Sequence, residues 1–176
     1  MKKTILPFLL LLLPMVTLAQ PITSTYTPTY GKTCKATPQE DEQSAVWVCP
    51  GAGGIKVEFA EGDIRQNATL IFPNKQQADL GLWSIKSGFS SIGDKMEWRM
   101  KKVNGKNTPI GFIIRYKVSE DPEDSSKITS YLMVGKIAGS NSCVTDIVKP
   151  QANQNVKART FADNAANQPC LNEQDQ

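Results

Sequence analysis

The chain has 176 residues, with 20 basic and 17 acidic side chains, and it contains no histidine. The absence of histidine excludes Ser-His-Asp and Cys-His catalysis, and every site that needs an imidazole as base or ligand. A net charge of only +3 gives no electrostatic footprint for nucleic acid, so we expect no nucleic-acid partner.

The N-terminal segment has the order of a secretory signal peptide. Lys2 and Lys3 precede an apolar run over residues 5–15, and small residues before and at Ala19 form a cleavage site. The run is too short to anchor the mature protein in a bilayer. We therefore predict a signal peptide over 1–19 and a periplasmic or secreted product of about 157 residues, the size of one domain. That product has 18 basic and 17 acidic side chains, a net charge of +1.

The rest of the chain reads as a succession of strands. Residues 20–33 are rich in Thr, Pro and Tyr and are predicted to be an extended or disordered lead-in. A polar loop is expected at 73–81 and a solvated acidic loop at 120–126. Apolar residues that alternate with polar ones, or form short runs, predict strands near 45–49, 55–59, 64–72, 96–101, 112–118, 127–137 and 143–148. The contiguous apolar run Leu132-Met133-Val134 predicts that the strand over 127–137 is covered on both faces.

Two of these strands are joined by Asn104-Gly105, a dipeptide typical of a tight hairpin. A strict two-residue loop would place Glu97 opposite Phe112 and mix charged with apolar residues on both faces of the sheet. An odd-length loop or a bulge would avoid this, with Pro109 as the natural place for the irregularity. We therefore predict that the turn is not a plain two-residue one.

One helix is predicted near the C-terminus, over about 151–167. Its narrow apolar stripe has helical spacing and consists of Ala158, Phe161, Ala162 and Ala165. Pro169 ends the helix, and residues 171–176 are expected to form a disordered tail. The predicted fold class is therefore α+β and mainly β, a small antiparallel sheet domain over residues 34–170 with one C-terminal helix.

The four cysteines indicate two disulfides in an exported chain, for which three pairings are possible. We favour Cys34–Cys49 and Cys143–Cys170, because each pair brackets one local segment. A zinc site is disfavoured, because the chain has no C-x-x-C pair and no histidine. We expect neither a metal nor a cofactor.

Several short motifs resemble those of a family of uncharacterised exported proteins of proteobacteria. The family has paired cysteines near both ends, an E-G-D-x-R block, an E-W-R strand and a C-terminal A-R-x-x-A-D helix. The matching residues in this chain are Glu61 to Arg65, Glu97-Trp98-Arg99, and Ala158-Arg159 with Ala162-Asp163. The resemblance implies export and brings no activity, substrate or cofactor. The chain departs from the family in a polar insert around 74–79 and in an Asn- and Gln-rich tail.

The E-G-D-x-R block holds the first candidate site. Glu61, Asp63 and Arg65 could form a polar ligand clamp, or a carboxylate pair for acid–base chemistry on a glycan. The alternative, which we favour, is a connecting turn whose arginine pairs with a carboxylate.

The second candidate site lies on the E-W-R strand and its neighbour. Trp98 shares a face with apolar residues and is predicted to lie in the core, as are Trp47 and Trp83. Glu97 and Arg99 then face outward, where Arg115 of the next strand could join them. The simpler alternative is a cross-strand Glu97–Arg115 ion pair. Lys157 and Arg159 are assigned to the solvated face of the helix.

The leading function hypothesis is a non-catalytic binding or interaction module outside the cytoplasm, with an unidentified protein or envelope component as partner. Inhibition of an envelope enzyme is a specific version of it. The alternative from another class is a carboxylate-based hydrolase of envelope glycans that uses Glu61 or Asp63 with Glu97.

Overall fold

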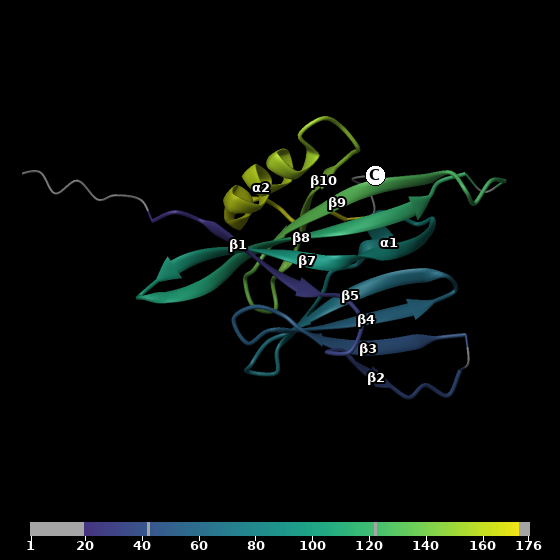
Figure 1. Ribbon diagram of the computed structural model, residues 1–176, viewed down its shortest axis with the longest axis horizontal. Coiled ribbons are helices and arrows are strands. Elements are labelled where there is room, and N and C mark those ends of the chain that lie inside the picture. Colours follow the sequence, from purple (N-terminus) through teal and green to yellow (C-terminus); the bar gives the residue numbers. More distant parts are fainter. Residues whose placement is uncertain (1–19, 42, 122, 173–176) are drawn as a thin grey trace, which may run out of the picture.

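The computed structural model describes residues 20–41, 43–121 and 123–172. Two five-stranded antiparallel sheets are stacked on each other, as Figure 1 shows. The first sheet contains, in spatial order, β1 (Thr23–Pro28), β7 (Phe89–Val103), β8 (Lys106–Ser119), β9 (Ile128–Lys136) and β10 (Cys143–Val148). The second contains β2 (Lys35–Thr37), β3 (Ala45–Pro50), β4 (Lys56–Gly62), β5 (Arg65–Ile71) and β6 (Gln77–Asp79).

Helices are few in this fold. A single turn, α1 (Leu82–Ile85), links the second sheet to the first, and α2 (Gln154–Asn164) follows the last strand and runs into a short 3-10 turn at Ala165–Asn167. The predicted mainly-β fold with one C-terminal helix is therefore confirmed, with two sheets in place of one. In the described part of the chain, we find no helix that has both the length and the apolar character to cross a membrane.

The main core lies between the two sheets. Alternate residues of the long strands point inward, so Trp98 and its neighbours meet apolar side chains of β4 and β5. Trp98 is completely buried, as predicted, and its indole N–H donates a 2.8 Å hydrogen bond to Thr27 Oγ1 on β1. Besides Trp98, the largest fully buried side chains of this layer are Phe59, Leu70, Leu82, Met96, Phe112, Ile114, Tyr116 and Met133.

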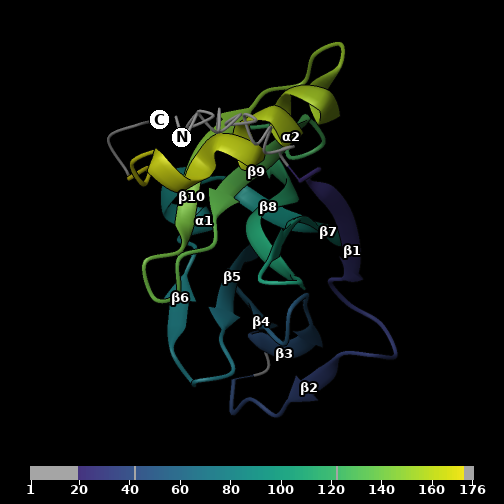
Figure 2. The same ribbon diagram turned by 90° about the vertical axis from the view of Figure 1, so that its left-hand side faces the viewer.

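A second, smaller core lies on the opposite face of the first sheet, beneath α2 (Figure 2). Leu132 and Val134 point toward the helix, whereas Met133 between them points into the main core. The expectation that this strand is covered on both faces is therefore confirmed. The helix approaches closely because Ala158 and Ala162, both buried, form its sheet-facing side.

The β7–β8 hairpin differs from its prediction at the turn and agrees with it at the bulge. Val103 pairs with Lys106, so the loop is the plain two-residue turn that we expected to be absent. Asn104 and Gly105 both have positive φ, as a type I′ turn requires. The register then shifts by one residue between Arg99 and Met100, next to Pro109 as predicted. This bulge returns apolar residues of both strands to the core side.

Both predicted disulfides are present, Cys34–Cys49 and Cys143–Cys170, with sequence separations of 15 and 27. The second disulfide holds the segment after α2 against β10, where the Leu171 N–H donates to the Val144 carbonyl at 2.9 Å. The predicted signal peptide over 1–19 and the end of the predicted tail, 173–176, lie outside the described residues.

Of the two alternatives for residues 20–33, extended or disordered, the extended one is found at β1, an edge strand paired with β7. Two further expectations need correction. The polar loop at 73–81 contains the short strand β6. Trp83 is about half exposed, because α1 is a single turn that buries only Leu82 and Ile85. Trp47 is partly buried and stacks on Phe59, with ring centroids 5.8 Å apart.

Candidate functional site

The six predicted site residues divide into two groups. Glu97, Arg99 and Arg115 lie on the outer face of the first sheet, on β7 and β8. Glu61, Asp63 and Arg65 lie at the β4–β5 hairpin of the second sheet.

On the outer face, Glu97 and Arg99 form ion pairs with the helix above them. Arg159 of α2 donates from Nε to Glu97 Oε1 at 2.7 Å. Arg99 makes a bidentate contact with Asp163, from Nε at 2.6 Å and from Nη2 at 2.9 Å. Arg159, expected on the solvated face of the helix, instead contacts the sheet. The E-W-R strand and the A-R-x-x-A-D helix therefore bind each other through two pairs of opposite charge.

These charges are buried, with Glu97 9 % and Arg99 7 % exposed. Burial raises the pKa of Glu97, but hydrogen bonds from Arg159 and Ser24 and the positive charge of Arg159 outweigh it and leave the pKa below its ordinary value. Arg159 also donates to the Tyr26 hydroxyl at 3.0 Å, so α2 and β1 are held to β7 together. We assign Glu97, Arg99, Arg159 and Asp163 a positioning role in the fold.

Arg115 stands apart from this network. It donates to Ser130 Oγ at 2.8 Å, and no ion pair joins it to Glu97 among the described residues, so the expected cross-strand pair is absent there. Arg115 and Glu97 do line one cavity of about 220 Å³, together with Lys95 and, from α2, Arg159. Neither Glu61 nor Asp63 is among the described residues that line it.

At the β4–β5 hairpin, the three predicted residues form a connecting turn. Gly62 pairs with Arg65, so Asp63 and Ile64 are the two turn residues, and Asp63 forms an exposed ion pair with Arg65. Glu61 accepts a hydrogen bond from the side chain of Gln66. Glu61, Asp63 and Glu97 thus lie on different sheets with separate partners, which gives no support to a carboxylate pair.

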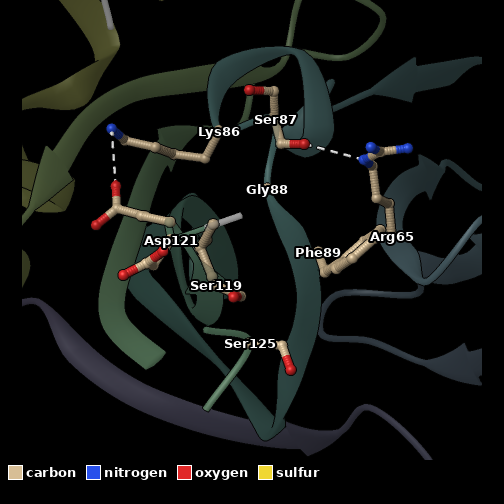
Figure 3. A pocket seen from close by; sticks show the side chains of 10 residues that line it. Arg65, Lys86, Ser87, Gly88, Phe89, Ser119, Asp121 and Ser125 are labelled. Carbon is tan, nitrogen blue, oxygen red and sulfur yellow. Dashed lines mark hydrogen bonds and ion pairs between the residues drawn. The ribbon is translucent and has the colours of Figure 1, made fainter. Parts of the chain in front are cut away.

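Arg65 nevertheless points toward a depression at this end of the molecule. Its Nε donates to the Ser87 carbonyl at 2.9 Å, and its guanidinium lies 5.5 Å from the centre of the Phe89 ring. Figure 3 shows Arg65 and Phe89 on one side of this depression, Lys86 and the acidic segment on the other, and Ser119 between them.

We call this depression the end groove. It consists of a polar cavity of about 370 Å³ and a neighbouring apolar one of about 340 Å³, which share Phe89, Ser119 and Ser125. The groove lies where the β4–β5 turn, the segment between α1 and β7, and the loop after β8 come together. Gly88 is required there, because a Cβ at this position would come within 2.2 Å of the Ser119 carbonyl oxygen.

The apolar half of the groove exposes three large side chains. Ile64 is 64 %, Phe89 44 % and Ile128 53 % exposed, and all three line the same cavity. Ile64 also has a φ of 57°, a left-handed conformation that is strained for a β-branched residue. Asn or Gly would adopt this conformation with less strain, so the sequence presents an apolar side chain at a cost in stability.

The polar half contains a buried hydroxyl without a partner. Ser119 is only 7 % exposed, and its Oγ accepts or donates no hydrogen bond within the described part of the chain. Nearby, Lys86 lies 3.6 Å from Glu120 and 5.1 Å from the Tyr131 ring centre. The Tyr131 hydroxyl donates to Glu120 at 2.6 Å, which lowers the pKa of that carboxyl. A general acid needs a raised pKa, so Glu120 is unsuited to that role.

Most of the end groove was not predicted from the sequence. Arg65 and Asp63 were candidate site residues but Ile64 was not, although an isoleucine in a two-residue turn was a detectable signal. Phe89, Ile128 and Ser119 lie at strand ends, where a single sequence gives no indication that they converge. Among the described residues, no three His, Cys, Asp or Glu side chains come together as metal ligands.

The chain matches no protein-family model, no curated protein and no solved structure. The resemblance to exported proteobacterial proteins stays a prediction, and the function has to be inferred from the site.

Proposed function

We propose that the protein is a non-catalytic binding module that acts outside the cytoplasm and captures a polypeptide segment of a partner in the end groove. The observation that carries this proposal is Ile64, an exposed and conformationally strained isoleucine beside two other exposed apolar side chains. Monomeric proteins rarely gather large apolar side chains around one depression without a binding role. Inhibition of an envelope enzyme is one specific version of this function.

Export is part of the same proposal. It is supported by the charged-then-apolar order of the N-terminal segment and by the two closed disulfides, which persist in oxidising compartments. The resemblance to exported proteobacterial proteins points the same way. Recovery of a chain that starts near Gln20 from the periplasm or medium, identified by mass spectrometry, tests this part.

The glycan-hydrolase alternative receives no support from the site. Retaining and inverting glycosidases need two carboxyl groups about 5–9.5 Å apart that face one cleft. Glu97 is instead ion-paired with Arg159 beneath α2, and Asp63 is exposed beside Arg65.

Affinity capture with matched variants tests the binding function. The oxidised protein is immobilised as wild type, as Ile64→Asp and as Val156→Asp, and each is exposed to envelope extract from the organism that makes it. Val156 is a suitable control because it is 60 % exposed on α2, away from the groove residues. We expect a partner retained by wild type and Val156→Asp and lost by Ile64→Asp. Equal retention by all three would discard the end groove as the binding site.

A further inference from the structure

The end groove has a charge pattern that restricts what can bind to it. The loop that forms its polar rim has four carboxylates, on Glu120, Asp121, Glu123 and Asp124. Within the described residues, only two lysines contact these carboxylates: Lys86 approaches Glu120, and Lys127 approaches Asp121 and Asp124. Four negative and two positive groups leave a net charge of −2 at this rim.

Two of the three cations that line the groove already have partners; the third, Lys117, lines the apolar cavity and has no ion pair among the described residues. Arg65 contacts the Asp63 carboxylate, the Ser87 carbonyl and the face of Phe89. Lys86 lies between Glu120 and the Tyr131 ring. At the polar rim, an acidic ligand would have to displace these contacts, whereas a basic one meets uncompensated carboxylates. Glu123 has no ion-pair partner within the described part of the chain.

A second observation, independent of the charge, points to a ligand with hydrogen-bonding groups. The Ser119 hydroxyl is buried, has no partner among the described residues, and lies at the junction of the apolar and polar cavities. Buried polar groups are normally paired, and a bound polypeptide backbone would supply a carbonyl or N–H at this junction. The apolar side chains around Ile64 then meet one side chain of that polypeptide, while the acidic rim meets another.

We propose that the segment bound in the end groove is an extended polypeptide with a lysine or arginine two positions from a large apolar residue. In an extended chain, residues i and i+2 point to the same side and lie about 7 Å apart, which lets the two side chains enter neighbouring cavities. The partner chemistry is therefore basic and apolar. This inference rests on the proposed binding function and adds the chemical class of the bound segment.

A peptide-display experiment tests it directly. A phage library of random 12-residue peptides is selected on the full-length protein, secreted with its own N-terminus and with both disulfides closed. Enriched peptides are synthesised, and their Kd values are measured by calorimetry against wild type and variants. We expect enriched sequences to combine Lys or Arg with Leu, Ile, Phe or Trp at i and i+2. Their affinity should fall as salt rises from 50 to 300 mM.

The variants separate the two halves of the groove. Ile64→Asp should weaken binding at least tenfold, because it places a charge in the apolar half. Asp121→Asn with Glu123→Gln should weaken it about threefold to tenfold, as expected for two screened charge pairs. Val156→Asp and Asp94→Asn should leave the affinity unchanged, because Val156 is on α2 and Asp94 lines the outer-face cavity. Circular dichroism confirms that each variant is folded.

Two outcomes would overturn the inference, and they are distinguishable. Peptides that depend on Ile64 but contain no basic residue, or that bind equally well after Asp121 and Glu123 are neutralised, would refute the basic segment and keep the binding function. If no enriched peptide depends on Ile64, the proposed binding function fails as well.

Discussion

Replacing Ile64 with glycine should weaken binding with little change in stability, because the backbone strain that glycine relieves offsets the stabilisation that it removes. Left-handed geometry costs a non-glycine residue about 1–2 kcal/mol, and glycine removes this cost. Two contributions act in the opposite direction. Glycine loses about 0.5–1 kcal/mol more chain entropy on folding. It also removes the buried third of the Ile64 side chain, which stabilises the fold by roughly 1 kcal/mol. These contributions nearly cancel. We expect the free energy of unfolding of Ile64→Gly to lie within about 1 kcal/mol of wild type.

Ile128→Gly is the matched comparison, because Ile128 is a similarly exposed isoleucine on the same rim, in a strand and without positive φ. This substitution relieves no strain, so we expect it to lower the free energy of unfolding by about 2 kcal/mol. Urea unfolding with intact disulfides, followed by tryptophan fluorescence, measures both. Equal destabilisation by the two substitutions would refute the strain at Ile64. Peptides selected on the groove should bind both variants at least tenfold more weakly.

Three further predictions concern the outer face and the disulfides. Glu97→Gln should destabilise most at neutral pH. The pKa of Glu97 is lowered in the folded state, so the ionised side chain stabilises the fold above about pH 4.3, and this stabilisation is lost as pH falls through the folded-state pKa. The difference in urea midpoint between wild type and Glu97→Gln should therefore become smaller below about pH 4. Arg99→Ala should lower the free energy of unfolding by about 3–5 kcal/mol, because it leaves Asp163 without its partner. The double variant with Asp163→Ala should lose less than the sum of the two single variants, which a double-mutant cycle by urea unfolding measures. Replacing Cys143 and Cys170 together by alanine should lower the free energy of unfolding by about 3.5 kcal/mol, measured in the same way; an unchanged midpoint would contradict the chain-entropy estimate for a 27-residue separation.

Much of the fold could be predicted from local patterns in the sequence. The alternation at Met96, Trp98 and Met100 assigned the inward face of β7, and the run around Met133 identified a strand covered on both sides. The disulfide pairing followed from the spacing of the cysteines. Such features depend on residues that are close together along the chain, so a single sequence is enough to predict them.

The features that could not be predicted depend on long-range contacts. β1 lacks an apolar period because both faces of this edge strand make polar contacts: Ser24 donates to Glu97 on the outer face, and Thr27 accepts from the Trp98 indole on the core side. Arg159 was assigned to solvent because nothing near it in sequence indicates that Glu97 lies beneath it. The end groove combines strand ends and loops far apart in the chain, and only its turn residues carried a local signal.

The two ion pairs beneath α2 have a consequence for the order in which the polypeptide can acquire its native form. Glu97 and Arg99 lie more than sixty residues upstream of Arg159 and Asp163, the groups that neutralise them. A ribosome-bound or prematurely terminated chain that lacks the helix would leave these two side chains in water, and the outer face of its first sheet would stay uncovered. Completion of the native state therefore waits for the last part of the chain to be made, and shortened translation products should be recognised by proteases.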